Sequence, residues 1–380
     1  MATFDSNGFQ EDRTQKLTAP VDLISQSDKF LQLVEKAERG EISQIPLMHS
    51  QEGRDPYKHL SKLGQMVPYG AGIYISVGGP SGCGKTAFVD HVYALLPLYM
   101  HWKHGIGKDI EICYFILERP LPYKIAKWSA WYMFVEHYMH IDVPIILNWY
   151  NKKRTMTPEE KEKLVEAQEF IKFLQDKVTI FHGPQTVESI WILTTNWLLD
   201  KKRQKDSIKI RFTDHVNDIE GTRNLSIFDQ HFLMAKKLRD EEGMGFVEVS
   251  QFNREIESEY RKENIGFSVK KSDWFGSSKV DQVADVMIGL LDPHKIKKGT
   301  DTIGYEVDSF VDEMIPESRY RSMKVVKNSY GGGLFNIGQA MLGEMGYFCD
   351  IPPPNLITET EYMAIKNAQL YNFIQINQHH

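Results

Sequence analysis

The chain has 380 residues, of which 42% are hydrophobic and 25% are charged, and its formal net charge is −6. These values are typical of a globular protein, and the length allows one large α/β domain with extensions or two small domains. They exclude a basic nucleic-acid coat protein, although a net acidic chain can still carry a local basic patch.

Signals for export, membrane insertion and disulfide formation are missing from the sequence. It has no run of about eighteen apolar residues, and its polar N-terminus lacks the apolar core of a signal peptide. Cys83, Cys113 and Cys349 are too few and too far apart for a disulfide framework or a metal site. We therefore expect a cytoplasmic protein without a membrane partner.

The N-terminal region precedes the regularly patterned part of the chain. Residues 25–39 are predicted to form an amphipathic helix, which Gly40 ends. A helix with no domain of its own to pack against is expected to fold back or to dock on a neighbouring subunit. We divide the chain into an N-terminal extension at residues 1–55, a main domain at residues 56–350 and a C-terminal tail at residues 351–380, to which the sequence assigns no role.

The main domain begins with a motif that predicts a phosphate-binding loop. The pattern G-x-x-x-x-G-K-[ST] is matched at every position by Gly79-Pro80-Ser81-Gly82-Cys83-Gly84-Lys85-Thr86. An apolar predicted strand precedes this loop and a predicted helix at residues 87–100 follows it. Glycines let backbone N–H groups close around a polyphosphate, and the helix N-terminus adds positive potential. We expect Lys85 to reach the β- and γ-phosphates and the Thr86 hydroxyl to bind Mg²⁺.

Strands and helices alternate through the main domain, which predicts an α/β fold with a mostly parallel central sheet flanked by helices. The strands are expected at residues 72–77, 111–117, 178–182, 208–213, 245–249 and 286–291, with shorter strands at 323–326 and 334–337. Thr157, followed by Pro158 and Glu160, is expected to cap one helix, and Thr186 is expected to cap the next.

Polar residues end several of these strands, at the edge where a parallel sheet binds its ligands. Asp214 ends the fourth strand, as expected of the Walker B carboxylate that binds the Mg²⁺ shell. Glu118 ends the second strand and can polarise an attacking water if it is buried; an ion pair with Arg119 is the alternative. Gln251 ends the fifth strand, where a polar side chain can sense a γ-phosphate. We interpret His215 as a hydrogen-bonded neighbour of Asp214 rather than as a catalytic group.

Together these residues resemble the DnaB-type replicative DNA helicases of bacteria and phages, which are hexamers with a RecA-like ATPase core. The resemblance covers about residues 60–350 and rests on six signatures that occur in the family's order and rough spacing. They are the phosphate loop, Glu118, Asp214, Ser250-Gln251-x-Asn253-Arg254, Ser272-Asp273 with Asp281-Gln282-x-Ala284-Asp285, and Lys327-Asn328-Ser329-Tyr330-Gly331. The sequence shows no separate N-terminal primase or primase-binding domain, and in this respect it is more similar to the phage members of the family. Phage members act in the host cytoplasm.

The resemblance implies a RecA-like P-loop NTPase that uses ATP and Mg²⁺, binds single-stranded DNA, forms a hexameric ring and meets a primase or loader protein. The implied roles are phosphate and Mg²⁺ binding for Lys85 and Thr86, the catalytic base for Glu118, the Walker B acid for Asp214 and γ-phosphate sensing for Gln251. Lys327 matches the basic residue that reaches the ATP of the adjacent subunit in the family. The helix at residues 25–39 would match the linker helix that packs on the next protomer.

The chain departs from the family at the arginine finger. That arginine lies two positions after the lysine matched by Lys327, where this chain has Ser329. A serine cannot supply the positive charge, whose effect is roughly a thousandfold or more in related enzymes. Either hydrolysis is slow, or Arg319, Arg321 or Lys324 substitutes for the missing side chain.

A second departure lies in the DNA-contacting loop. The family's Ser-Asp-Leu-Arg-Glu-Ser-Gly is replaced by Ser272-Asp273-Trp274-Phe275-Gly276-Ser277-Ser278, so Phe275 takes the place of a phosphate-contacting arginine. DNA phosphates would then be bound by Arg254, Gly276, Ser277, Ser278 and Lys279. Trp274 and Phe275 either stack on bases or pack in the core, and the sequence leaves both alternatives open. Residues 255–271 are expected to form a loop of mixed charge.

The sequence thus predicts an ATP-dependent DNA helicase that translocates on single-stranded DNA as a ring and unwinds the duplex. The alternative is a RecA-like DNA-binding ATPase without unwinding activity, such as a strand-exchange, loading or regulatory protein, which Ser329 and Phe275 favour. A small-molecule kinase shares the phosphate loop but usually carries an arginine-rich lid, for which we find no candidate.

Overall fold

The computed structural model describes residues 31–32, 35, 61–148, 154–200, 207–221, 224–258, 261, 268–296, 299–311 and 318–368. The chain divides into two compact units, Met1–Ser43 and Gln44–His380. In the first unit the described residues are Leu31, Gln32 and Glu35, which are helical and exposed. The rest of the predicted helix at residues 25–39 lies outside the described residues.

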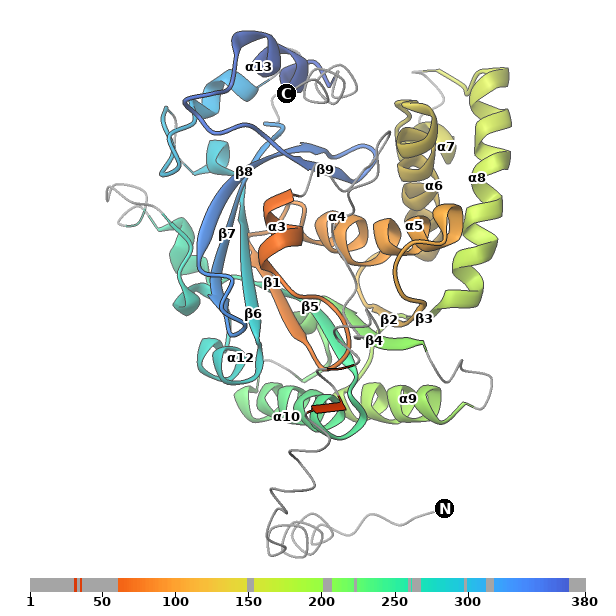
Figure 1. Ribbon diagram of the computed structural model, residues 1–380, viewed down its shortest axis with the longest axis vertical. Coiled ribbons are helices and arrows are strands. Elements are labelled where there is room, and N and C mark those ends of the chain that lie inside the picture. Colours follow the sequence, from red (N-terminus) through yellow and green to blue (C-terminus); the bar gives the residue numbers. More distant parts are fainter. Residues whose placement is uncertain are drawn as a thin grey trace, which may run out of the picture. The chain divides into compact units, whose positions relative to one another are not determined.

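In the described part of the second unit, nine strands form one sheet in the order β3-β2-β4-β5-β1-β6-β7-β8-β9 (Figure 1). The first six strands in this order are parallel to one another, and β7, β8 and β9 extend the sheet in the antiparallel sense. Their bounds are β1 Tyr74–Gly79, β2 Ile110–Ile116, β3 Val178–His182, β4 Ile208–Asp214, β5 Gly245–Gln251, β6 Val286–Leu291, β7 Tyr320–Asn328, β8 Phe335–Leu342 and β9 Tyr347–Asp350. The predicted α/β fold with a mostly parallel sheet is confirmed.

All eight predicted strands are present, and β3 and β6 have the predicted ends. Both β7 and β8 are longer than predicted because polar residues, such as Arg321 and Gln339, continue their pairing beyond the apolar centre. The strand β9 was not predicted, because its four residues are too few to show a period of two.

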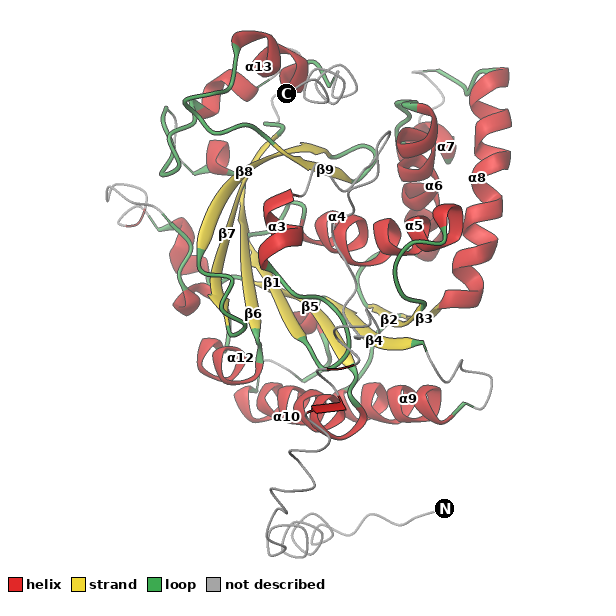
Figure 2. Cartoon of the chain, viewed as in Figure 1, coloured by secondary structure: helices red, strands yellow, loops and turns green. Residues whose placement is uncertain are grey.

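Helices cover both faces of the sheet (Figures 1 and 2). One face is covered by α4 (Lys85–Val89), a π-helical segment (Asp90–Leu95), α5 (Leu96–His104), α6 (Leu121–His137) and α8 (Pro158–Lys177). The other face is covered by α9 (Val187–Leu199), α10 (Leu225–Glu242) and α12 (Ser277–Val283). Further α-helices are α3 (Ser61–Met66), α7 (Val143–Ile146) and α13 (Glu359–Lys366).

The central strands β1, β2, β5 and β6 each contribute to two separate hydrophobic cores. Ile112 and Tyr114 of β2 belong to the core with α5, α6 and α8, whereas Cys113 and Phe115 belong to the core with α9 and α10. Successive side chains of a strand point to opposite faces, so a strand buried on both faces reads as a continuous apolar run. This explains why the sheet was predictable from apolar runs without alternation.

Both predicted helix caps are confirmed. The Thr157 side chain accepts a hydrogen bond from the Glu160 backbone N–H at 3.1 Å, and the Glu160 carboxylate accepts one from the Thr157 N–H at 2.8 Å. At the start of α9, Thr186 forms the same reciprocal pair with Ser189. These contacts satisfy N–H groups that the first helical turn leaves without a partner.

The first part of the predicted C-terminal tail packs on the main domain. Ile365 of α13 is fully buried, and the ring of Tyr362 lies 4.7 Å from the ring of Phe310, centroid to centroid. Residues 351–368 therefore contribute to the hydrophobic core, and residues beyond 368 lie outside the described part.

A charged network lies in the core beneath α10. Glu248 of β5 is fully buried, and its Oε1 lies 2.6 Å from Arg211 Nη2 and 2.9 Å from His231 Nε2. The Tyr74 hydroxyl donates a hydrogen bond to the other carboxylate oxygen. Burial alone would raise the pKa of Glu248, but His231, Arg211 and the Tyr74 hydroxyl outweigh it and lower the pKa to about 2.

We predict that Glu248→Gln lowers the free energy of unfolding by about 3–5 kcal/mol, the usual loss when one partner of a buried ion pair is removed. The folded-state pKa lies below the ordinary value of 4.5, so the carboxylate stabilises the fold above about pH 4.5 and loses this effect as the pH falls towards 2. Urea titrations between about pH 5 and about pH 2 should show the unfolding free energies of the wild type and variant converging as the pH falls. Glu242→Gln, at an exposed position on α10, serves as control. If the difference in unfolding free energy between the wild type and Glu248→Gln does not narrow as the pH falls, the lowered pKa of Glu248 is contradicted.

Candidate active site

The phosphate loop follows β1 at the carboxyl edge of the sheet and leads into α4. Gly84 has a φ of 97°, and a Cβ at this position would lie 2.7 Å from Met341 Sδ. A Cβ on Gly79 would lie 2.5 Å from the carbonyl oxygen of Leu290. Both positions therefore require glycine, because any other residue would force the loop or its neighbours to move.

Two residues of the loop motif make defined side-chain contacts. Lys85 is buried, and its Nζ donates a hydrogen bond to the Pro80 carbonyl oxygen at 2.8 Å, so the side chain folds back over the loop. The Thr86 hydroxyl donates a hydrogen bond to Asp214 Oδ1 at 2.8 Å. The end of β4 and the start of α4 are thus joined at the phosphate loop.

Asp214 is buried among positively charged and hydrogen-bonding groups. Burial alone would raise the pKa of its carboxyl group, but His215, Lys124, the Thr86 hydroxyl and Lys85 together lower it below the ordinary value. The side chain is therefore an anion at neutral pH. A carboxylate beside a hydroxyl is an oxygen donor set of the kind that Mg²⁺ prefers, so these two residues fit the ion.

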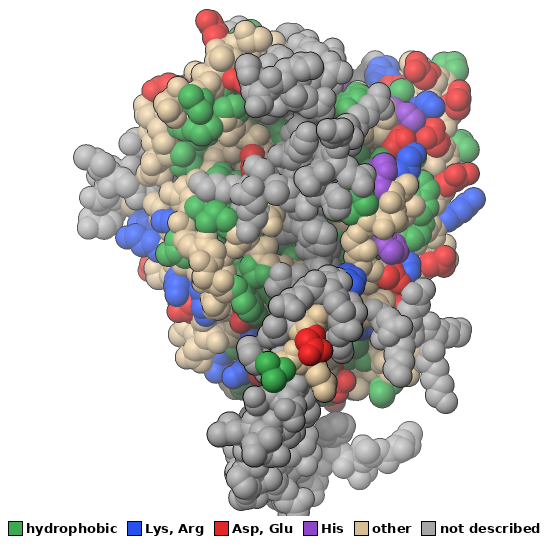
Figure 3. Space-filling model, in the orientation of Figure 1, with side chains coloured by type: hydrophobic (Ala, Val, Ile, Leu, Met, Phe, Trp, Pro, Cys, Tyr) green, Lys and Arg blue, Asp and Glu red, His purple; other side chains and the backbone are tan. Residues whose placement is uncertain are grey.

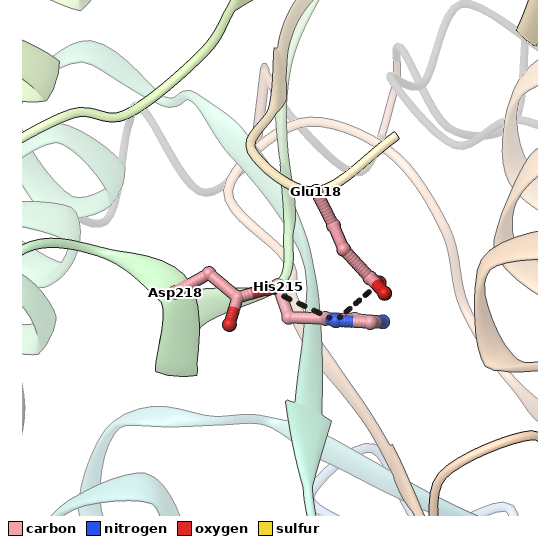
Figure 4. A group of neighbouring side chains, drawn as sticks. All are labelled: Glu118, His215 and Asp218. Carbon is pink, nitrogen blue, oxygen red and sulfur yellow. Dashed lines mark ion pairs between the residues drawn. The ribbon is translucent and has the colours of Figure 1, made fainter. Parts of the chain in front are cut away.

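Glu118 is joined to Asp214 through His215. Figure 4 shows the part of this arrangement formed by Glu118, His215 and Asp218. His215 Nδ1 lies 3.4 Å from Glu118 Oε2 and 3.4 Å from Asp218 Oδ2, and His215 Nε2 lies 3.1 Å from Asp214 Oδ1. The alternative ion pair, between Glu118 and Arg119, is longer than the contact with His215, because Arg119 Nε lies 4.0 Å from Glu118 Oε1. The Glu118 side chain is 48% exposed, and the burial expected of a catalytic base is not provided by this chain alone.

The ligand atoms of Glu118, His215 and Asp218 lie within 4.8 Å of one another, close enough to hold a metal ion. This set includes an imidazole nitrogen, which suits transition metals better than Mg²⁺. The Thr86 and Asp214 pair, with oxygen atoms only, is the better match for Mg²⁺.

Gln251 lies at the same edge of the sheet. It is the last residue of β5 and pairs with Gly79, the first residue of the phosphate loop. Its backbone N–H donates a hydrogen bond to Asn217 Oδ1 at 2.7 Å, and its side chain is exposed. The structure therefore brings Lys85, Thr86 and Gln251 to one place, together with the two strand-end carboxylates.

Lys327 does not join this group. It lies on β7 and pairs with Met287 near the amino end of β6, so it belongs to the opposite edge of the sheet. Its Nζ donates a hydrogen bond to the Asp281 carbonyl oxygen and lies 3.5 Å from the Asp281 carboxylate. Ser329 follows at the same edge, is exposed, and donates its backbone N–H to the Asp285 carbonyl oxygen at 2.9 Å.

Two of the three basic residues considered as substitutes for an arginine finger are held within the chain. Arg319 forms a bidentate ion pair with Glu344, in which Nη1 lies 3.0 Å from Oε2 and Nη2 lies 2.9 Å from Oε1. Lys324 Nζ donates a hydrogen bond to Ser268 Oγ at 2.5 Å, and burial lowers the pKa of Lys324. Neither side chain is directed towards the phosphate loop by these contacts.

Arg321 has a different place from the one expected. It is buried, and its Nε donates a hydrogen bond to the Cys83 carbonyl oxygen, within the phosphate loop, at 2.9 Å. Its Nη1 lies 3.4 Å from Asp292 and also donates to the backbone carbonyls of residues 318 and 320. Arg321 therefore contacts the phosphate loop of its own chain, as neither Arg319 nor Lys324 does through these contacts.

The two aromatic residues of the expected DNA loop pack inside the protein. Trp274 is fully buried, its Nε1 donates a hydrogen bond to Ser76 Oγ at 3.0 Å, and its ring lies 4.6 Å from that of Phe252. Phe275 is partly buried and meets the ring of Phe228 edge-on at 5.3 Å. Of the two alternatives, the structure supports core packing for Trp274.

The expected DNA-contacting residues come from two adjoining segments. The backbone N–H of Asn253 donates to the Asp273 carbonyl oxygen at 2.7 Å, which ties the segment after β5 to the one before α12. Gly276 has a φ of 63° and precedes α12 directly. Arg254 and Ser278 are exposed, Lys279 Nζ lies 3.4 Å from Gln282 Oε1, and the Ser277 side chain and most of residues 259–267 lie outside the described part.

Sequence reasoning gave His215 no catalytic role and missed Asp90 and Lys124 altogether. Asp90 is the only Asp, Glu, Lys or Arg within residues 87–100, and Lys124 lies in a largely apolar helical stretch that it shares with Lys127. Because an unpaired charge is seldom buried, two such residues in neighbouring helices are a signal for a buried pair.

Two solved structures are similar to this chain in fold. An ATPase domain of G40P has a TM-score of 0.59 and 17% sequence identity, over 86% of this chain and 98% of that chain. A DnaB-like replicative helicase, described with its interactions with primase, has a TM-score of 0.55 and 18% identity, over 75% of this chain and 60% of that chain. No family model matches the sequence, and no curated protein does. The chain thus has the fold of these helicase ATPase domains.

Among the residues that the structure describes, every helix is too short or too polar to cross a lipid bilayer.

We predict that Arg321→Lys weakens nucleotide binding by about tenfold, since a lysine cannot reproduce the hydrogen bond to the phosphate loop and a charged hydrogen bond contributes about 1.5–3 kcal/mol. The dissociation constant of a fluorescent ADP analogue is the measurement. Arg319→Lys, which alters a neighbouring arginine bound to Glu344, is the control. Equal affinities of Arg321→Lys and the wild type would show that the loop does not depend on this contact.

Proposed function

We propose that this chain is the ATP-hydrolysing motor of a DNA helicase. The observation that carries the proposal is the convergence of Thr86, Asp214 and Glu118 at the carboxyl edge of a sheet whose fold is that of helicase ATPase domains. A phosphate loop and two carboxylates at one edge are what hydrolysis of a nucleoside triphosphate requires.

In this proposal, Lys85 leaves the Pro80 carbonyl and binds the β- and γ-phosphates, and Thr86 and Asp214 bind Mg²⁺. The bound ion would neutralise charge on the phosphates. Glu118 accepts a proton from the attacking water, whose oxygen bonds to the γ-phosphorus as the bond to the bridging oxygen breaks. His215 holds Glu118 beside Asp214, and Gln251 responds to the γ-phosphate from the neighbouring strand end.

The position of Lys327 supports a shared site between two copies of the chain. Lys327 and Ser329 lie at the edge opposite to the phosphate loop, so neither can reach the nucleotide of its own chain. In a ring, the same edge would face the next protomer's phosphate loop and would cover the exposed Glu118. We therefore propose an oligomeric ring, with a hexamer as the expected size, and Lys327 as the residue that reaches across.

Single-stranded DNA is the proposed ligand of the segments around Arg254 and Gly276. Gly276 and Ser278 offer backbone and hydroxyl donors, and Arg254 and Lys279 add positive charge. On the face in Figure 3, acidic and basic side chains are interspersed over α8, which is unlike an extended DNA-binding stripe.

The same proposal includes a primase or loader as a further partner, since one similar structure is described with primase. It also includes action in the cytoplasm.

We predict that Lys85→Ala and Glu118→Gln both abolish DNA-stimulated ATP hydrolysis, but for different reasons. Lys85→Ala removes phosphate binding, so nucleotide affinity falls as well. Glu118→Gln keeps the shape of the side chain and loses the base, so nucleotide should still bind and the turnover number should fall by about 100-fold or more. Phosphate release and nucleotide titration with and without single-stranded DNA separate these outcomes.

A strand-displacement assay tests the helicase function itself. Unwinding of a forked duplex that requires ATP and an intact Lys85 is expected. ATP hydrolysis with DNA binding but without unwinding, whatever the strand polarity, would instead support a RecA-like DNA-binding ATPase. A protein that remains monomeric with nucleotide and DNA would contradict the ring.

We predict that Ser329→Arg raises DNA-stimulated ATP hydrolysis by at least about tenfold, because an arginine finger contributes roughly a thousandfold or more in related enzymes and part of this should be regained. Ser329→Gln, of similar reach without charge, is the matched control. Nucleotide affinity of dilute, dissociated protein should be unchanged. No gain in hydrolysis under conditions where the protein is oligomeric would argue against a shared site at this edge.

A further inference from the structure

A buried lysine lies directly behind the Mg²⁺-binding pair of the proposed site. Lys124, on the first turns of α6, is only 2% exposed. Its Nζ lies 2.9 Å from Asp90 Oδ2, 3.6 Å from Asp214 Oδ2 and 2.8 Å from the Tyr114 hydroxyl oxygen. An ammonium group is seldom buried to this extent, and here two carboxylates compensate for the loss of water.

Asp90 is the anchor of this arrangement. It is buried at the first residue of the π-helical segment that interrupts the helix after the phosphate loop. Its carboxylate also accepts hydrogen bonds from the Tyr114 hydroxyl at 2.7 Å and from Trp128 Nε1 at 3.1 Å. Such π segments are frequent at functional sites. These two donors hold the Asp90 carboxylate in one place, and the carboxylate in turn holds the Lys124 ammonium group that contacts it.

The two oxygens of the Asp214 carboxylate have different partners. Oδ1 accepts the hydrogen bond from Thr86 and lies 3.1 Å from His215 Nε2, whereas Oδ2 lies next to Lys124. A carboxylate bound on one side only can rotate about its bond to the side chain, but one held on both sides cannot. Lys124 supplies the contact on the Oδ2 side, opposite to Thr86 and His215, and so keeps Oδ1 as the oxygen presented to the phosphate loop.

We infer that Lys124, anchored by Asp90, is a positioning residue that fixes the Asp214 carboxylate for Mg²⁺ binding beside Thr86. This inference rests on the proposed function, because it concerns the ion that would accompany the nucleotide. Partners behind a metal ligand orient it, and their loss costs about 10- to 100-fold in metal affinity or activity. Lys124 has this relation to Asp214 although it does not touch nucleotide, ion or water itself.

The test compares nucleotide binding with and without Mg²⁺ in the full-length protein. The affinity for a fluorescent ADP analogue is measured in EDTA and in Mg²⁺, and the ratio gives the gain that the ion provides. Lys124→Met is expected to bind the analogue in EDTA as the wild type does and to lose about 10- to 100-fold of the gain from Mg²⁺. Raising the Mg²⁺ concentration should restore part of the lost affinity.

Two further variants test the arrangement. Asp90→Asn keeps the lysine but weakens its anchor, so it should reduce the gain from Mg²⁺ in the same direction and by less. Lys124→Arg keeps the charge and should retain more of the gain than Lys124→Met. Lys127→Met is the matched control: Lys127 lies one turn further along α6 and donates to the Glu344 carbonyl oxygen at 2.9 Å, away from Asp214.

Equal losses in EDTA and in Mg²⁺ would overturn the inference, because a merely structural ion pair affects both measurements alike. The inference would also be overturned if Mg²⁺ raised the affinity of Lys124→Met for the analogue as much as it raises that of the wild type. If Lys124→Met does not fold, judged by circular dichroism, Asp90→Asn decides, and a wild-type gain in that variant refutes the inference.

The readout also separates this inference from the proposed function. ADP binding does not depend on hydrolysis or on DNA. A wild-type protein that hydrolyses no ATP would refute the motor function while the comparison of Mg²⁺ gains still decides the role of Lys124.

Discussion

The parallel register of four central strands is the constraint on which the site depends. In the order β2-β4-β5-β1, Ile116 lies beside Asp214, and Gly79 lies beside Gln251. The carboxyl ends of parallel strands lie at the same edge of the sheet, so the parallel arrangement alone brings together residues that are far apart in the sequence. A shift of one residue in a single strand would turn its side chains to the opposite face and remove its contribution to the site.

The second constraint is that the charges near this edge are buried and must be compensated. A charge that loses water without gaining a partner destabilises the fold by several kcal/mol. Asp214 is compensated by the Thr86 hydroxyl and by neighbouring cations, Glu248 by Arg211 and His231, and Arg321 by Asp292 and backbone carbonyls. The same contacts that satisfy these charges fix the direction of each side chain. The contacts of Asp214 and Arg321 therefore serve both the stability of the fold and the geometry of the site.

Most of the sheet and the phosphate loop could be predicted because their signals are local. A run of apolar residues marks a buried strand, and the phosphate loop is a contiguous motif in which each residue has its own backbone requirement. The strand-end carboxylates could be placed because a parallel sheet collects the ends of its strands at one edge.

The parts that sequence reasoning did not reach depend on contacts between distant residues. The role of Arg321 follows from a hydrogen bond to Cys83, and no local pattern distinguishes it from a free arginine. The pair of Asp90 and Lys124 requires knowing that the π-helical segment and α6 lie side by side on one face of the sheet. The place of Trp274 was ambiguous for the same reason. The sequence around a loop tryptophan does not distinguish a buried ring that is hydrogen-bonded to Ser76 from an exposed ring that stacks on a base.

The edge that carries Lys327 and Ser329 shows what has changed relative to the resembled helicases. The Asp285 carbonyl accepts the backbone N–H of Ser329, so the chain at this position is held in place while the charged side chain is missing. Positive charge at the phosphate loop is instead supplied within the chain, by Lys85 and by Lys295, whose Nζ lies 3.4 Å from the Gly82 carbonyl oxygen. Charge provided within one chain is present before any neighbour arrives. In the proposed function, binding of the phosphates would therefore need a single chain, and only the acceleration of their cleavage would depend on assembly.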